Sequence, residues 1–123
     1  MNTILINGIN QTMIECLPGD GWLEKESQAL DLVAACGESG TQNLMIHAGV
    51  LTDDFFRLRT GLAGAILQKF SNYHIRTALI LSPELVNQGR FREMVLEANR
   101  GNQLRVFYNR EQAVAWLCQF GLD

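Results

Sequence analysis

The clearest pattern along the chain is an apolar stripe of helical period between Gly61 and Tyr73. Its members recur at spacings of three and four residues, as one face of an α-helix requires: Leu62, Ala63, Ile66, Leu67, Phe70 and Tyr73. Thr60 stands just before the stripe and is predicted to be the N-cap, because its hydroxyl can accept an N–H of the first turn. Short apolar runs on both sides, residues 44–46 and 77–81, are typical of parallel strands covered on both faces.

Before this stretch, residues 3–6 and 12–16 read as two strands of an antiparallel hairpin. Asn7 and Gly8 form a strong tight-turn pair, so the turn is predicted there, with the next two residues in or near it. Residues 17–21 read as a loop. A helix is predicted to begin at Trp22 or Glu24 and to stop at Gly37. Its predicted buried stripe consists of Leu23, Leu30, Val33 and Ala34.

After this stretch, Ser82 and Pro83 predict a helix start, and Gly89 is expected to break that helix. A second helical segment runs to Asn99, and residues 104–108 form a strand nearer the sheet edge. Asn109 resembles a helix cap. The last helix is predicted to bury Ala113, Trp116, Leu117 and Phe120.

The element order is therefore β-β-α-β-α-β-α-β-α. Such alternation predicts an α/β fold, with four or five helices packed on a mixed, mostly parallel sheet of about five strands. We expect residues 1–123 to form a single domain, since this length supports one core of normal size.

Composition narrows the class of protein. Hydrophobic residues make up 47 % of the chain and prolines number two, which argues against disorder. No apolar run approaches the length of a membrane span, and residues 1–3 lack the charged start of a signal peptide. A cytoplasmic location without membrane contact is the expectation.

The potential metal ligands and thiols are scattered. Cys16, Cys36 and Cys118 have no CxxC spacing, and their neighbours in the sequence are largely apolar. This favours buried thiols over a disulfide or a metal site. His47 and His74 have no acid or thiol at ligand spacing, so structural roles are expected. We expect no metal and no cofactor.

Charge is unevenly distributed along a chain of net charge −3. Residues 1–56 hold eight acidic residues and a single base, whereas residues 57–110 hold nine bases and three acids. This polarity could complement an acidic partner, a nucleotide or a second copy of the chain. Basic residues scattered in an acidic chain, without stacking aromatics, do not form a nucleic-acid footprint.

The candidate site lies at the start of the central helix. Arg57, Arg59, Thr60 and Gly61 surround a helix N-terminus, where free N–H groups and the helix dipole favour an anion. The alternative is an ordinary N-cap flanked by solvated arginines. Asp53 and Asp54 precede these residues and complete the predicted surface.

The element order, together with Thr60, Gly61, Leu62 and Ala63, resembles the STAS fold of sulphate transporters and anti-sigma-factor antagonists. That resemblance implies phosphorylation of Thr60 by a kinase partner, although this chain has Arg57-Leu58-Arg59 where the family usually has an aspartate. Residues 55–73 more closely resemble a family of small bacterial proteins known only as domain of unknown function 4180. This second resemblance implies a fold and no mechanism.

Two functions follow as expectations. The first is a non-enzymatic regulatory or protein-interaction module switched at Thr60; the second is a protein that binds a small anion or nucleotide through Arg57, Arg59, Thr60 and Gly61. An enzyme is disfavoured because the adjacent Asp53 and Asp54 point in different directions and also serve the helix dipole. Self-association through Phe55 and Phe56 is a further alternative, against the simpler reading that both rings pack under the loop.

Overall fold

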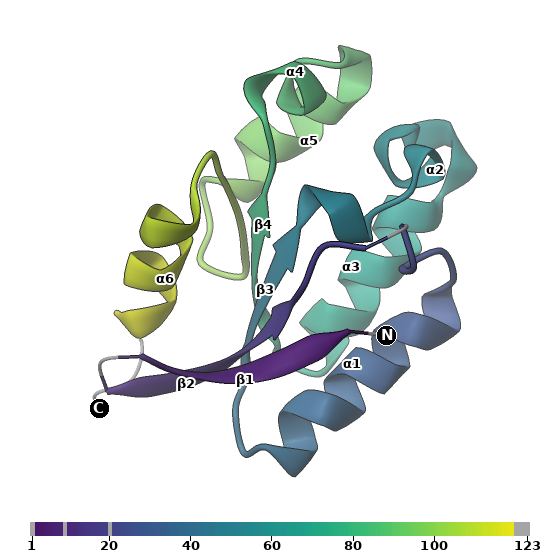
Figure 1. The fold of residues 1–123 in the computed structure, drawn as a ribbon. Coiled ribbons are helices and arrows are strands. Elements are labelled where there is room, and N and C mark those ends of the chain that lie inside the picture. The colour runs from purple at the N-terminus through teal and green to yellow at the C-terminus, as the bar shows by residue number, and fades with distance from the viewer. Residues whose placement is uncertain (1, 9, 20, 120–123) are drawn as a thin grey trace.

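A five-stranded sheet runs through the centre of the structure, with its strands in chain order (Figure 1). The structure is a computed structural model that describes residues 2–8, 10–19 and 21–119. The strands are β1 (Thr3–Gly8), β2 (Gln11–Cys16), β3 (Asn43–His47), β4 (Arg76–Ile80) and β5 (Leu104–Phe107). β1 pairs antiparallel with β2, and the other three pairings are parallel. The predicted α/β class and mostly parallel sheet are confirmed.

Six α-helices and two 3-10 turns occur within the described residues, where the sequence predicts four or five helices. They are α1 (Glu26–Glu38), α2 (Asp53–Phe56), α3 (Leu62–Asn72), α4 (Pro83–Val86), α5 (Gly89–Ala98), α6 (Arg110–Cys118), η1 (Ala48–Val50) and η2 (Leu58–Thr60). Parallel strands in chain order, joined by right-handed crossovers, place all the crossover helices on one face. Accordingly α1, α3 and α5 share one apolar cluster, whereas α6 covers the opposite face (Figure 1).

The sheet alternates between these two layers. In β2, Ile14 and Cys16 pack toward the crossover helices, whereas Met13 lies in the cluster beneath α6 with Met45 and Trp116. Side chains of a strand point to opposite faces in turn, so Glu15 also faces α6. Glu15 is charged but almost fully buried, with only 4 % of its surface exposed. It is therefore an acidic residue inside the smaller of the two apolar cores.

The hairpin turn lies two residues later than predicted. Asn7 pairs with Thr12 and Gly8 with Gln11, so β1 continues through the predicted turn pair. Asn10 carries the positive φ, 63°, that a tight hairpin needs. The lack of a side chain at Gly8 instead allows the side chain of Cys118 to approach β1 closely, because a Cβ at Gly8 would lie 2.8 Å from the Cys118 sulfur. The prediction was therefore wrong for Asn7 and Gly8, whereas Asn10, predicted in or near the turn, does lie in it, and the antiparallel pairing is confirmed.

The first helix also differs from the prediction. It begins at Glu26, and Leu23 instead bridges the extended backbone of Leu51. The later start changes the buried face, which comprises Ala29, Leu32 and Cys36. Leu30 is 39 % exposed and Ala34 is exposed. The predicted stop at Gly37 is also wrong, since the helix ends at Glu38 and Gly40, at φ +67°, turns the chain.

Capping chemistry was predicted more accurately. The Ser82 hydroxyl accepts the N–H of Leu85, and the Asn109 side chain accepts that of Gln112. Ala113, Trp116 and Leu117 are buried as expected, while Phe120 lies outside the described residues. Tyr73 was placed on the buried stripe, but it follows the end of α3 and is 53 % exposed. No helix in the described ranges has both the length and the apolar character needed to span a membrane.

Candidate functional site

Two chain connections meet beyond the carboxyl ends of β3 and β4. Residues 48–61 follow β3 and residues 81–88 follow β4 and lead into α5. The ring of Phe56, in the first connection, lies 5.1 Å from the ring of Phe91, near the start of α5. Open α/β sheets bind ligands outside the carboxyl ends of their strands. The predicted site residues all lie in the first of these connections.

The local sequence fixes the path of this connection. Thr52 is extended and precedes α2, whose first turn carries Asp53 and Asp54 as the helix dipole favours. Arg57 ends that helix in an extended conformation and leads into η2. Gly61 then adopts φ +78°, a left-handed conformation that glycine enters without steric cost, and α3 begins at Leu62. Arg57, Arg59 and Thr60 are thereby held on a short exposed turn.

Thr60 is exposed, as predicted, but it precedes the N-cap of α3, which is Gly61. Its hydroxyl accepts the N–H of Leu62 at 3.2 Å and so still serves the first helical turn. The same hydroxyl shares its proton between the carbonyl oxygens of Asp54, at 2.7 Å, and Arg57, at 2.9 Å. Thr60 therefore ties α2 to α3 through three backbone groups. Beyond it, the amide end of α3 is open, because a Cβ on Gly61 would meet nothing within 4 Å.

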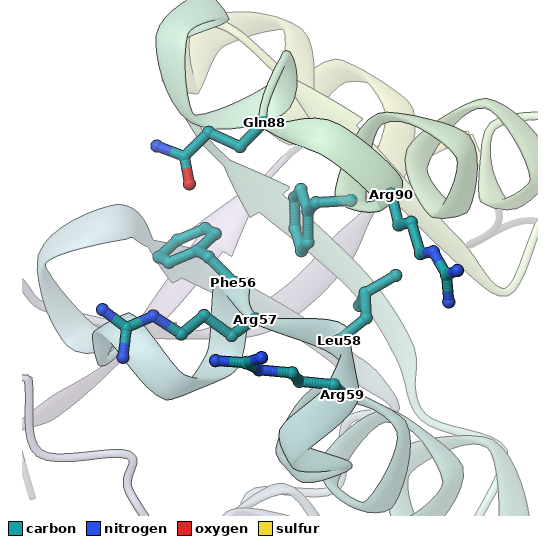
Figure 2. A pocket seen from close by; sticks show the side chains of 7 residues that line it. Phe56, Arg57, Leu58, Arg59, Gln88 and Arg90 are labelled. Carbon is teal, nitrogen blue, oxygen red and sulfur yellow. The ribbon is translucent and has the colours of Figure 1, made fainter.

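A cleft of about 500 Å³ lies beside this turn, and we refer to it as the arginine cleft. Its lining comprises Phe56, Arg57, Leu58, Arg59, Gln88, Arg90 and Phe91 (Figure 2). The structure thus brings Arg57 and Arg59 together with Arg90, which the sequence analysis did not single out. Thr60 and Gly61 adjoin the cleft in the chain but do not line it. A signal for Arg90 was available, since it follows the loop at the carboxyl end of β4.

The charge in the cleft is poorly balanced. Arg57 stands 4.0 Å from Asp54, and both side chains are about two-thirds exposed, so this pair is weak. Within residues 2–8, 10–19 and 21–119, the side chains of Arg59 and Arg90 make no ion pair or hydrogen bond. Figure 2 shows the side chains of Arg57 and Arg59 extending in the same direction, whereas that of Arg90 extends away from them. All three are exposed and can turn toward an anion at the mouth of the cleft.

Aromatic rings form the apolar part of the same cleft. Phe91 is buried, and Phe56 is half-buried with its ring edge against Phe91. Phe55 is fully buried behind them, 5.6 Å from Phe56. For Phe55 the simpler expectation, packing under the loop, is therefore confirmed. Phe56 is the ring that a ligand in the cleft would touch.

The two predicted acidic residues lie on the far side of Arg57. Asp53 shares a smaller hollow, of about 250 Å³, with Leu85 and Gln88, and both acids line another hollow with Glu24. Together with the arginine cleft these hollows form a surface that changes from basic to acidic across Arg57. An anion therefore fits the side that carries Arg59 and Arg90.

A second polar cluster, missed by the sequence analysis, lies on the α6 face of the sheet. The Glu15 carboxylate accepts two hydrogen bonds from the Arg110 guanidinium, at 2.9 and 3.0 Å, and lies 2.6 Å from Nε2 of His47. Arg110 lowers the pKa of Glu15, burial opposes that shift, and His47 adds to it. The same contact raises the pKa of Arg110. His47 therefore does have an acidic neighbour, which the spacing along the chain concealed.

Glu15, His47 and Arg110, which we call the Glu15 cluster, connect β2, β3 and the first turn of α6. Its arrangement anchors α6, because both carboxylate oxygens are occupied and Glu15 is almost fully buried. A signal for it was present in the sequence, namely a single acid inside the apolar strand Met13-Ile14-Glu15-Cys16. Among the described residues, no group of three or more His, Cys, Asp or Glu side chains could hold a metal ion.

The profile of one protein family, the domain of unknown function DUF4180, matches residues 9–117. The chain belongs to this family. The DUF4180 match covers β2 through most of α6 and therefore both the arginine cleft and the Glu15 cluster. Neither a curated protein nor a solved structure matches the chain.

Proposed function

We propose that this protein is a non-enzymatic interaction module that binds an anionic group of a partner protein in the arginine cleft. The observation that carries the proposal is that Arg57 and Arg59, from the connection after β3, and Arg90, from the start of α5, line one cleft. Like charges that line one cleft repel one another unless acids compensate them, and within the described ranges Arg59 and Arg90 have no acidic partner. A bound phosphate or carboxylate supplies the missing charge and accepts the N–H groups of the guanidinium forks.

The residues of the arginine cleft are better suited to binding an anion than to catalysing a reaction. The arginine cleft contains three cations, one amide and apolar side chains, but no general base and no nucleophile. Guanidinium groups stay protonated in proteins and cannot accept a proton. The half-buried Phe56 adds an apolar contact for whatever carries the anion.

Phosphorylation of Thr60 would regulate this binding. A phosphate brings a charge of about −1.5 to −2 and removes the hydroxyl proton that Asp54 and Arg57 now share. The new charge would lie on the same turn as Arg57 and Arg59, so it would compete with the partner's anion. Exposure of Thr60 leaves the hydroxyl accessible to a kinase once this turn opens.

Pull-down from cells that contain the native protein tests the module. We expect Arg59→Gln with Arg90→Gln to lose partners that the wild type retains, and Arg92→Gln, an exposed arginine of α5 outside the cleft, to retain them. Unchanged partners in the double variant would refute the proposal. For the switch, Thr60→Glu should lose the same partners while Thr60→Ser keeps them, and equal retention by both would exclude regulation at Thr60.

A free nucleotide is the second candidate, favoured by the size of the cleft. Its volume of about 500 Å³ lies within the range of small-molecule sites. Thermal denaturation with ATP, inorganic phosphate or uncharged adenosine distinguishes this case, since a ligand that binds only the folded state raises its stability. We expect ATP alone to raise the melting temperature, and Arg59→Gln to remove that shift. No shift at millimolar ATP would exclude this candidate.

A further inference from the structure

β1 is an edge strand of the sheet that the described residues form. Among those residues it pairs with β2 alone, and its sequence Thr-Ile-Leu-Ile-Asn-Gly contains neither a charged residue nor a proline. Edge strands of soluble proteins normally carry such residues because they prevent pairing with another chain. Ile4 and Leu5 are large apolar residues that stay 41 % and 47 % exposed. The edge is thus suited to accept another strand.

The hydrogen-bond pattern identifies the backbone groups that are free. Leu17 donates to the carbonyl oxygen of Asn2 at 2.8 Å, so Asn2 turns its polar backbone groups toward β2. In an antiparallel pair these groups alternate in direction from one residue to the next, and the register of β1 is unbroken. Thr3, Leu5 and Asn7 therefore direct their N–H and C=O groups outward. Within the described residues these groups have no strand partner.

We propose that a second copy of this chain pairs antiparallel along the outer edge of β1, with a two-fold axis at Leu5. In this register Thr3 faces Asn7 of the second copy and Leu5 faces Leu5. Each of these residues directs its backbone groups outward, so every facing pair can exchange two hydrogen bonds. A register shifted by two residues would lose one of the three pairs. The strand is thus complementary to itself, as a two-fold interface requires.

Side chains fit the same register. Leu5 meets Leu5 on the face of the crossover helices, and Ile4 meets Ile6 on the α6 face, so apolar pairs form on both faces. Because β1 is uncharged, no like charges face each other across the axis. The result is one continuous sheet of two copies. One strand pair buries a small interface, so a weak dimer that depends on concentration is expected.

Sedimentation velocity over a wide range of protein concentration tests the dimer. Leu5→Lys would place two like charges on the axis, and we expect it to raise the dissociation constant about tenfold or more. Leu96→Lys is the matched control, since Leu96 is 50 % exposed on α5, away from β1, and this change should leave the constant unaltered. Circular dichroism verifies that both variants fold.

Disulfide cross-linking tests the register, in a Cys118→Ser background. Facing residues of a hydrogen-bonded pair lie about 5.5 Å apart between Cα atoms, within the range that a disulfide spans. Thr3→Cys protein mixed with Asn7→Cys protein should form a cross-linked heterodimer, and neither should cross-link by itself. The proposal is overturned if the protein stays monomeric at all concentrations. That result is expected if a strand of another protein is the natural occupant of this edge. A dimer that Leu5→Lys leaves intact would also overturn the proposal.

Discussion

Removal of the Arg110 guanidinium from the Glu15 cluster should lower the free energy of unfolding by an amount that depends on pH. We consider Arg110→Met, which keeps an unbranched stem and deletes both hydrogen bonds to the buried carboxylate. Loss of a partner from a fully buried ion pair costs about 3–5 kcal/mol. Here the Arg110 side chain is 44 % exposed, so water screens the pair and we expect a coupling of about 1–2 kcal/mol.

A double-mutant cycle isolates this coupling. Urea denaturation of the wild type, Arg110→Met, Glu15→Gln and the double variant at neutral pH gives the interaction free energy directly. Arg100 and Glu97 supply the control cycle, because their side chains are nearly four-fifths exposed at 3.5 Å, and a coupling below about 0.5 kcal/mol is expected.

The direction of the pH dependence follows from the lowered pKa of Glu15. Its ordinary value of 4.5 applies to the unfolded chain, and the folded value lies below it. The pair therefore contributes its full stability above pH 4.5 and loses it as the pH falls through the folded pKa. The coupling should thus disappear in acid while the Arg100–Glu97 control barely changes. A coupling at neutral pH no larger than that control, or one that persists when Glu15 is protonated, would refute the reasoning.

The remaining predictions concern the thiols, one close approach and one cap. Burial raises the pKa of Cys36 to about 11 and that of Cys16 further, so a thiol reagent at pH 8 should label Cys118 rapidly in the folded protein and the other two only after denaturation. Rapid labelling of all three thiols would contradict the burial. Gly8→Ala should destabilise by about 1–2 kcal/mol, because the new methyl group meets the Cys118 sulfur, and adding Cys118→Ala should recover most of that loss in urea denaturation. Asn109→Ala should cost about 1 kcal/mol through the lost cap of α6, and an unchanged urea midpoint would show that this cap contributes little.

The fold was predictable from local chemistry wherever short-range signals determine structure. The helical stripe from Leu62 to Phe70, the Ser82 cap and the Asn109 cap are all set by neighbours within four residues. The turn after β1 was not predictable in this way. Asn7 and Gly8 are typical turn residues, but here Gly8 lies in the strand and allows the approach of Cys118, which is more than a hundred residues away in the chain.

The site was predictable in part for the same reason. Arg57, Arg59 and Thr60 follow one another in the chain, so their common turn could be inferred from the sequence. Arg90 joins them only because α5 begins beside the connection after β3, and that depends on the order of strands β3 and β4. Glu15 and Arg110 are still further apart, and only the completed sheet brings them together. A local pattern can mark Glu15 or Arg90 as unusual, but which residues they meet depends on strand order.

The one-sided placement of the crossover helices has a consequence for synthesis. The growing chain covers one face of the sheet step by step, because α1, α3 and α5 each follow the strand they connect. In the part of the chain that the structure describes, the opposite face is covered by α6, which leaves the ribosome after all five strands of the sheet have been made. Until then Met13, Met45 and Ala78 form an uncovered apolar strip, and unburied surface of this kind is where nascent proteins aggregate or recruit chaperones.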